Sequence, residues 1–243
     1  MKKQMVDDYY TSRKAKLLKD FDKAAKRLRR ILVSYYGDDL TDTIARETRQ
    51  EYEALIPELP YIGGKKNLLT RNLIGSAQAL ALYRVLKRHG KTVEEAGKVI
   101  YEAVEAQIGA YSRLLLCLLG KLRFTKLVVK KLRKLAAESQ KRRYPGDWVC
   151  TFVEGDGEEF DFGIDYTECG ICKFYHAQGA DEFTPFLCLT DFPMSKAFGS
   201  GLVRTMTIAE GCEKCDFRWK RGREVKQGWP PEFLNIQGFK ENV

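Results

Sequence analysis

The hydrophobic pattern of the chain changes at "RYPGDW", residues 143–148. Before this point, apolar residues recur at spacings of three and four with Lys and Arg between them, which is typical of amphipathic helices. After it, apolar and polar residues alternate, which is typical of strands, and Pro145-Gly146 has the chemistry of a turn. We therefore predict an α+β protein: an N-terminal helical half, followed by a small, mostly antiparallel β-sheet with one or two helices.

The same boundary divides the chain into two regions, a basic helical region, residues 1–143, and an α+β, Cys-rich region, residues 144–243. With 243 residues, 44% of them hydrophobic, the chain is long enough to bury a sizeable core. We expect the two regions to pack as one unit. There is no internal repeat, P-loop, GxGxxG or HExxH, so the common nucleotide and metalloprotease patterns do not apply.

In the helical region, the pattern predicts a first helix within residues 12–36 and a second within residues 72–90, ending at Gly90. Thr92 and Glu95 have the spacing of a capping box and begin a third. A further helix, apolar from Leu114 and then basic, is expected to continue to about residue 143. We expect its leucines to belong to the core of the helical half.

In the second region, residues 148–155 and 158–168 alternate on either side of Asp156-Gly157, which predicts a tight β-hairpin. Residues 185–191, 201–211 and 215–222 are predicted to form three more strands. In the last of these, alternation sends Cys215, Phe217 and Trp219 to one face and Asp216, Arg218 and Lys220 to the other. A helix is predicted to follow Thr167, its expected N-cap, and to carry Cys169 and Cys172 in its first turns.

The charge is unevenly distributed, with 32 Lys and Arg against 16 Asp and Glu in residues 1–145, and 10 against 17 in the remainder. A basic helical half raises the alternatives of nucleic-acid or membrane-surface binding. The cations are spread over several helices without a known reader pattern, so nucleic acid is not the expected partner. We predict no membrane span, and the N-terminus lacks a secretory pattern, which favours a cytoplasmic location.

Seven cysteines, an odd number, argue against a disulfide framework in a reducing compartment. The pairs Cys169-x-x-Cys172 and Cys212-x-x-Cys215 are compatible with tetrahedral zinc, although 40 residues is a long separation between the pairs. Alternatively, the N-terminus of a helix, with Lys173 nearby, favours a nucleophilic thiolate at Cys169. Burial in the core is the plainer interpretation, above all for Cys117 and Cys150.

Two arginines in the strand-like region need partners. Arg204 and Arg218 could grip a carboxylate of a ligand, or could bond Asp191 and Asp216 as part of the fold. His176 is the histidine nearest to the cysteines in sequence, and a lone helical histidine is more often a packing or surface residue than an acid or base.

Residues 144–231 resemble the L-2-amino-thiazoline-4-carboxylic acid hydrolase family. The resemblance is carried by "DYTECGICKFYHAQGADEFTPFLCLTDF", "GSGLVRTMTIAEGCEKCDFRWKRG" and "GWPPEF". Within them, the matching elements are Glu168-Cys169, Pro185 with Cys188 and Asp191, Arg204 with Thr207, and Cys215-Asp216-Phe217-Arg218. Cys172 and Cys212 lie outside the family pattern, which weakens the four-cysteine zinc interpretation.

The resemblance implies a hydrolase that opens a cyclic amidine carrying a carboxylate to give a carbamoyl-cysteine. In this hypothesis Cys188 or Cys169 attacks the amidine carbon, and Asp191 and Asp216 bind the amidinium and move protons. Arg204 or Arg218 holds the carboxylate of the small-molecule substrate. No cofactor is required, unless Cys169, Cys188 and Cys215 hold zinc whose bound water attacks instead. A non-catalytic ligand-binding or sensor protein on the same fold is the alternative.

Overall fold

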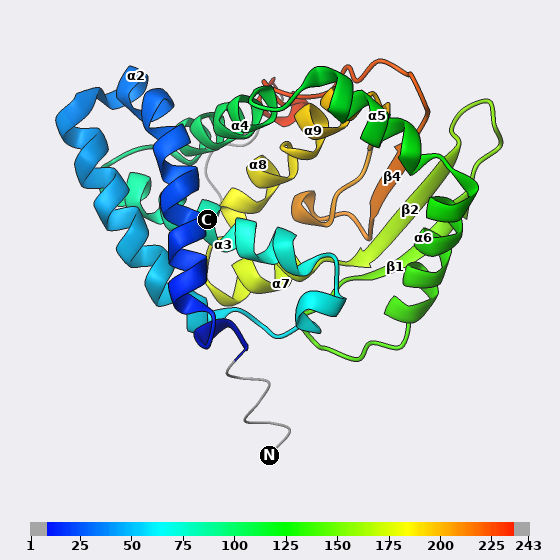
Figure 1. Ribbon diagram of the computed structural model, residues 1–243, viewed down its shortest axis with the longest axis horizontal. Coiled ribbons are helices and arrows are strands. Elements are labelled where there is room, and N and C mark those ends of the chain that lie inside the picture. The colour runs from blue at the N-terminus through cyan, green and yellow to red at the C-terminus, as the bar shows by residue number, and fades with distance from the viewer. Residues whose placement is uncertain (1–8, 236–243) are drawn as a thin grey trace.

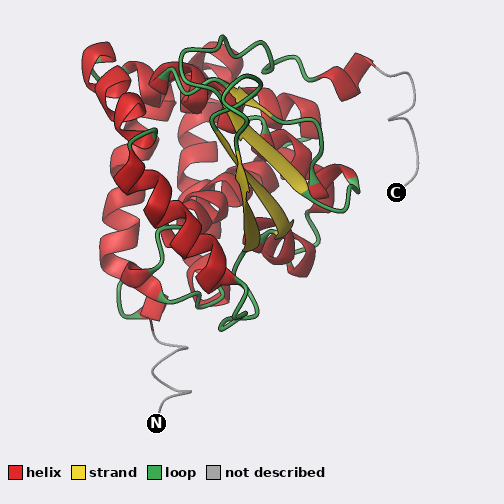
Figure 2. Ribbon diagram, turned by 90° about the vertical axis from the view of Figure 1, so that its right-hand side faces the viewer, coloured by secondary structure: helices red, strands yellow, loops and turns green. Residues whose placement is uncertain are grey.

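The computed structural model describes residues 9–235 (Figure 1). Long helices come first: α2 (Lys14–Leu55), α3 (Thr70–Arg88), α4 (Val93–Gly109), α5 (Arg113–Arg123) and α6 (Lys126–Ser139). Strands β1 (Val149–Glu154), β2 (Phe162–Glu168), β3 (Leu202–Val203) and β4 (Cys215–Trp219) follow, interleaved with α7 (Gly170–Ala177), α8 (Thr184–Cys188) and α9 (Asp191–Phe198), and then α10 (Glu232–Asn235). Figure 2 shows the helices gathered around a small sheet. This order confirms the predicted α+β class.

Helix α2 is a pair of helical arms joined at Gly37. The Gly37 backbone adopts φ 74°, ψ 174°, a conformation open to glycine, and this allows the chain to reverse. The arms then lie side by side (Figure 1): Phe21 stacks on Tyr52 with ring centroids 5.2 Å apart, and Asp22 accepts a 2.9 Å hydrogen bond from Arg49. The first arm is the amphipathic helix expected within residues 12–36.

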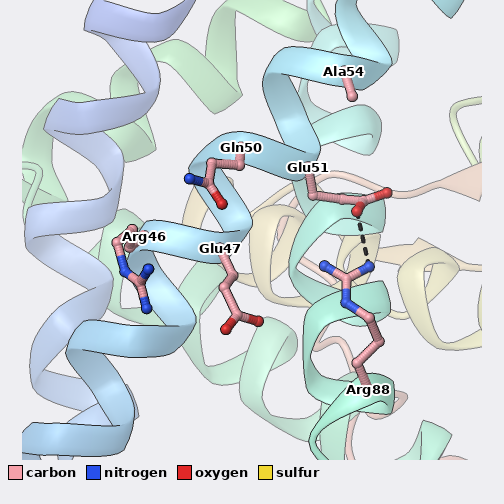
Figure 3. Close-up of a pocket in the computed structure, with 6 residues that line it drawn as sticks. All are labelled: Arg46, Glu47, Gln50, Glu51, Ala54 and Arg88. Carbon is pink, nitrogen blue, oxygen red and sulfur yellow. Dashed lines mark hydrogen bonds and ion pairs between the residues drawn. The ribbon is translucent and has the colours of Figure 1, made fainter.

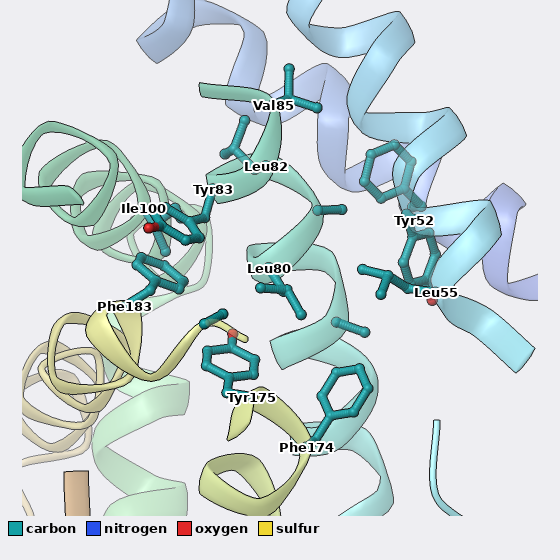
Figure 4. Close-up of a cluster of buried hydrophobic side chains, with 14 of the residues drawn as sticks. Tyr52, Leu55, Leu80, Leu82, Tyr83, Val85, Ile100, Phe174, Tyr175 and Phe183 are labelled. Atoms are coloured by element: carbon teal, nitrogen blue, oxygen red, sulfur yellow. The ribbon is translucent and has the colours of Figure 1, made fainter. Parts of the chain in front are cut away.

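Helices α3 and α4 follow their sequence signals closely. α3 ends at Arg88 and Gly90 takes φ 75°, while the Thr92 hydroxyl accepts a 3.1 Å hydrogen bond from the Glu95 amide to cap α4. One buried cluster joins these helices to the second region (Figure 4). Within it, Phe183 stacks on Tyr83 at 4.4 Å and the Tyr175 hydroxyl donates a 2.8 Å hydrogen bond to the Ser76 carbonyl.

Within the described residues the sheet has four strands in the order β1-β2-β4-β3, and every pairing is antiparallel. β1 and β2 form a hairpin, but its connection, residues 155–161, is longer than the predicted tight turn. The Asp156 carboxylate accepts hydrogen bonds from the amides of Glu158, Glu159 and Phe160, and these bonds stabilise a wider loop.

The outer edge of β1 is joined to the end of α6. The Cys150 amide donates to the Ser139 hydroxyl at 3.0 Å, and the Gln140 side-chain amide donates to the Cys150 carbonyl at 2.7 Å. Ala136 of α6 is buried in the second hydrophobic cluster with Cys150 and Phe162. α6 therefore covers the sheet and also occupies backbone groups on its edge.

One predicted strand is wrong and another is too long. Residues 185–191 contain the end of α8, a turn at residues 189–190 and the start of α9, because Pro185 suits a first helical turn and the buried Phe186, Leu189 and Phe192 are spaced by three. Of residues 201–211, the strand comprises residues 202–203. Thr205 and Met206 then direct their amides to the Asp216 carboxylate, which takes the chain away from strand pairing.

The helix expected from Leu114 to about residue 143 is two helices, α5 and α6, separated at Phe124 and Thr125. The prediction that its leucines form core is also wrong for α5, since Leu114 is 84% exposed and Leu118 56%. Among residues 9–235, no helix has the length and apolarity needed to cross a membrane.

Candidate active site

Four of the predicted site residues, Cys169, Cys188, Asp191 and Cys215, lie on one face of the sheet and come from different elements. Cys169 lies between β2 and α7, Cys188 ends α8, Asp191 begins α9 and Cys215 begins β4. On this face, Phe162 and Ile164 of β2 lie opposite Trp219 and Phe217 of β4, and Tyr166 lies opposite Cys215. The alternation predicted for residues 215–219 thus places Cys215 on the side where the helices meet.

Cys169 is the N-cap of α7, with extended backbone dihedrals (φ −114°, ψ 121°). A hydrogen bond from the Cys172 thiol and the amides of Cys172 and Ile171 lower the pKa of Cys169, and together they outweigh the opposing effect of burial. Thr167 was the expected cap, but its hydroxyl donates to the Val149 carbonyl instead.

Lys173 interacts with Cys169 through charge, as expected, but its side chain makes no hydrogen bond with the Cys169 thiol in the described part of the chain. Its ammonium group donates to the carbonyls of Pro145 (2.8 Å) and Asp147 (3.0 Å) and pairs with Glu168. Arg142 pairs with the same Glu168 carboxylate. The Cys169 thiolate is therefore stabilised chiefly by the helix N-terminus and the neighbouring thiol.

The other cysteines of the cluster have raised pKa values. The hydrogen bond to Cys169 and burial raise the pKa of Cys172, and burial raises that of Cys188 well above its ordinary value. Burial raises the pKa of Cys215 to about 11, although its sulfur accepts a 3.2 Å hydrogen bond from the Ile208 amide. The electrostatics therefore favour Cys169 as the thiolate of the group.

Asp191 and Arg204 form an ion pair at this site. An Arg204 terminal nitrogen donates to the Asp191 carboxylate at 2.8 Å, and the other donates to the Cys188 carbonyl at 3.2 Å. The Arg204 side chain is 4% exposed, whereas that of Asp191 is 45% exposed. Desolvation of the carboxyl group by the surrounding protein raises the pKa of Asp191 and outweighs the opposing effect of Arg204. This carboxyl therefore takes up a proton more readily than an ordinary aspartate.

Arg204 is held in place by aromatic rings and by its own backbone. Its guanidinium carbon lies 5.0 Å from the ring centroid of Phe192 and 5.2 Å from that of Phe217. Gln227 accepts from the Arg204 amide at 3.1 Å and donates to the Arg204 carbonyl at 2.7 Å. The buried Arg204 Nε has no hydrogen-bond partner in the described part of the chain, so one donor remains unused.

Arg123 was not singled out from the sequence. It ends α5 with its guanidinium carbon 4.3 Å from the ring centroid of Trp219, and its charge acts on both Asp191 and Tyr166. Burial lowers its pKa, and it has no hydrogen-bond or ion-pair partner within residues 9–235. A signal was present: in helical spacing, Arg123 shares a face with Gly120 and Leu116, away from the exposed Leu118.

Asp216 and Arg218 lie on the opposite face of the sheet. The Asp216 carboxylate accepts from the Thr205 amide at 2.8 Å and from the Thr205 hydroxyl and Met206 amide at 2.6 Å. Arg218 pairs with Asp165 at 2.7 Å, and Lys214 joins the same carboxylate at 2.8 Å. The structure does not bring these two predicted site residues together with Cys169, Cys188 and Asp191.

A metal site is not assembled in the described residues. Between residues 9 and 235, no group of three or more His, Cys, Asp or Glu side chains is arranged to hold a metal ion. The geometry therefore does not support a zinc ion held by Cys169, Cys188 and Cys215. Zinc at these cysteines stays a prediction, which the metal content of the purified protein would test. His176 is exposed and lies 3.1 Å from Asp181, as expected of a surface residue.

The surface has two pockets, of which one borders the candidate site residues and the other does not. The first, of about 430 Å³, lies between α2 and α3 and contains the 2.8 Å ion pair of Glu51 and Arg88 (Figure 3). The second, of about 280 Å³, lies beside α9. Phe192 and Gln227, which hold Arg204, also line the second pocket, so it borders the candidate active site.

Comparison with known proteins identifies a family but no individual relative. The model of the family described as L-2-amino-thiazoline-4-carboxylic acid hydrolase matches residues 71–219, from the first turn of α3 to the last residue of β4. No curated protein and no solved structure matches the chain. The match includes Cys169, Cys188, Asp191, Arg204 and Arg123, and it extends the family region into the helical half. With more than half of its length matched, the chain belongs to the L-2-amino-thiazoline-4-carboxylic acid hydrolase family.

Proposed function

We propose that this protein is a cytoplasmic hydrolase that opens a cyclic amidine carrying a carboxylate, with Cys169 as its nucleophile. The observation that carries the proposal is the position of Cys169 at the N-terminus of α7, where two amides and the Cys172 thiol favour its thiolate. The family name supports the type of reaction. A substrate of the 2-amino-thiazoline-4-carboxylate type has the electrophilic carbon that such a thiolate attacks.

The proposed reaction has two steps. The Cys169 sulfur bonds to the amidine carbon, the ring C–N bond breaks, and the ring nitrogen leaves as an amine after accepting a proton. Water then adds to the same carbon, the Cys169 sulfur departs with the bonding electrons, and the product is a carbamoyl-cysteine. The raised pKa of Asp191 suits a carboxyl that gives and takes protons in these steps.

Two arginines are candidates for holding the substrate carboxylate. Arg123 has no hydrogen-bond or ion-pair partner in the described chain, and Arg204 keeps an unused Nε donor. A carboxylate bound between them would direct the ring toward the face of the sheet where Cys169 and Asp191 lie. The proposal therefore assigns Arg123 and Arg204 to binding and leaves Arg218 with Asp165 in the fold.

The test is turnover of L-2-amino-thiazoline-4-carboxylate by the purified chain, followed by appearance of the carbamoyl-cysteine. Cys169→Ser should abolish turnover while Cys150→Ser, on the far strand, retains it. Mass spectrometry of protein quenched during turnover should find the added mass on the peptide that contains Cys169. Full activity in Cys169→Ser would refute the nucleophile, and tight binding without turnover would favour a ligand-binding or sensor protein.

A further inference from the structure

Helices α5 and α6 expose large apolar side chains to solvent. Five of these side chains are leucines of α5, which are spaced by three and four and so lie on one face of the helix. A sixth leucine lies in the first turn of α6. We call them the leucine face: Leu114 (84% exposed), Leu115 (48%), Leu118 (56%), Leu119 (45%), Leu122 (47%) and Leu127 (79%). A contiguous exposed patch of this kind marks a surface for interaction.

The packing of α5 fixes this exposure. On its opposite side, a Cβ at Gly120 would overlap the Phe198 carbonyl oxygen, so the helix backbone lies directly against α9. Arg123, on the same side, covers Trp219. Rotating α5 to bury the leucines would break both contacts and expose Arg123. The exposure of the leucine face is therefore a property of the folded protein.

The surroundings of the leucine face are cationic. Residues 110–137 contain eight Lys and Arg and no Asp or Glu. Arg133 is paired with Glu154 at 2.7 Å. Five further exposed cations have no ion-pair partner in the described part of the chain: Arg113, Lys121, Lys126, Lys130 and Lys131.

We propose that the leucine face docks on the surface of a membrane rich in anionic lipid. Leucines inserted at the level of the headgroups leave water, while the flanking cations meet lipid phosphates. A second copy of this chain would bring like charges together around the leucines. A nucleic acid would match the cations but offers no apolar surface to six leucines. The occupant that satisfies both features is the anionic bilayer surface.

The first experiment is cosedimentation of the full chain with vesicles. Vesicles of phosphatidylcholine with phosphatidylglycerol should sediment the protein, and vesicles of phosphatidylcholine alone should sediment much less. Raising the salt concentration should weaken but not abolish the binding, because the leucines remain inserted when charges are screened. No sedimentation with anionic vesicles at low salt would overturn the proposal.

Matched variants distinguish binding through the leucine face from non-specific adsorption through any exposed leucine. Leu118→Gln should weaken vesicle binding roughly tenfold, because one inserted leucine is lost. Leu68, which is 58% exposed but lies outside α5 and α6, is its control, and Leu68→Gln should leave binding unchanged. Equal losses in the two variants would refute a specific face.

The charge contribution is tested in the same way. Replacing Lys130 and Lys131 by Gln should weaken binding to anionic vesicles, whereas replacing the exposed Lys23 and Lys26 of α2 by Gln should have little effect. A stable dimer in light scattering that Leu118→Gln dissociates would show that a second copy covers the face. If the protein binds a nucleic-acid duplex, and if this binding is lost in the lysine variant but kept in Leu118→Gln, the cations bind nucleic acid instead. Either result would overturn the proposal.

Discussion

Cys169 and Cys215 are cysteines of the same cluster, yet their surroundings act on their thiols in opposite directions. Amides at the start of α7 and the Cys172 thiol lower the pKa of Cys169, while burial raises that of Cys215 to about 11. Each sulfur reacts as the thiolate, so reactivity toward an alkylating reagent follows these pKa values.

The first prediction concerns the pH dependence of alkylation. As the pH rises, the rate at Cys169 should level off below the pH at which an ordinary cysteine does so, because its thiolate is already formed. The rate at Cys215 should continue to rise toward about pH 11. Peptide mass spectrometry after brief iodoacetamide treatment measures both rates, and identical profiles would contradict the assignment.

The second prediction concerns Arg123. Arg123→Gln should raise KM for the carboxylate substrate about tenfold or more with a smaller change in kcat, because a charge-assisted bond to the substrate is lost. Arg71→Gln, which removes an exposed charge from α3, is the control. If Arg218→Gln raises KM and Arg123→Gln does not, the carboxylate binds on the other face of the sheet.

Residue types and spacing indicated which residues lie near one another in sequence and on which face of β4 they fall, but not which partners they bind. Cys169, Cys188 and Asp191 follow from local pattern and family resemblance, and alternation in residues 215–219 already separated Cys215 from Asp216 and Arg218. The partners of these residues depended on contacts distant in sequence: Asp165 is 53 residues from Arg218. Arg123 comes from a different region, and the face that it shares with Gly120 is a weak signal within a leucine-rich stretch.

At the scale of elements, α5 is positioned by a glycine. Gly120→Ala should destabilise the protein by about 1–3 kcal/mol, because the added methyl group overlaps the Phe198 carbonyl and must move α5 or α9. A methyl group added at Gly75 in α3 would meet no atom within 4 Å, so Gly75→Ala should instead stabilise by up to about 1 kcal/mol. Thermal unfolding of both variants measures the difference, and equal shifts would contradict this packing.

Element types were predictable where one periodicity dominates a long segment, as in α3 and α4. The element type was not predictable in residues 185–191, where the strand-like alternation is short and the contacts that decide the structure come from α4 and the helical core. Phe186, for instance, packs against Gly97 of α4. For α5, amphipathicity correctly predicted a helix, but periodicity does not reveal which side faces the protein.

At the scale of the whole molecule, one buried cluster contains side chains from both sides of residue 144. We therefore predict that the two regions unfold together. Far-UV circular dichroism reports mainly on α2–α4, whereas all three tryptophans, Trp148, Trp219 and Trp229, lie in the second region. The two signals should give coincident transitions in denaturant, and a fluorescence transition separate from the loss of helix would refute this.

The sheet offers little backbone to a further strand at either of its edges. On one side, β3 offers two residues, Leu202 and Val203, as a template for pairing. On the other, Ser139 and Gln140 already occupy the amide and carbonyl of Cys150. Edge-to-edge addition of a second chain, the usual route from a small sheet to fibrils, therefore has little backbone on which to begin. Unwanted self-association of this protein should start from the leucines of α5 at high salt, where their flanking cations are screened, and substitutions that improve its solubility belong there rather than in the strands.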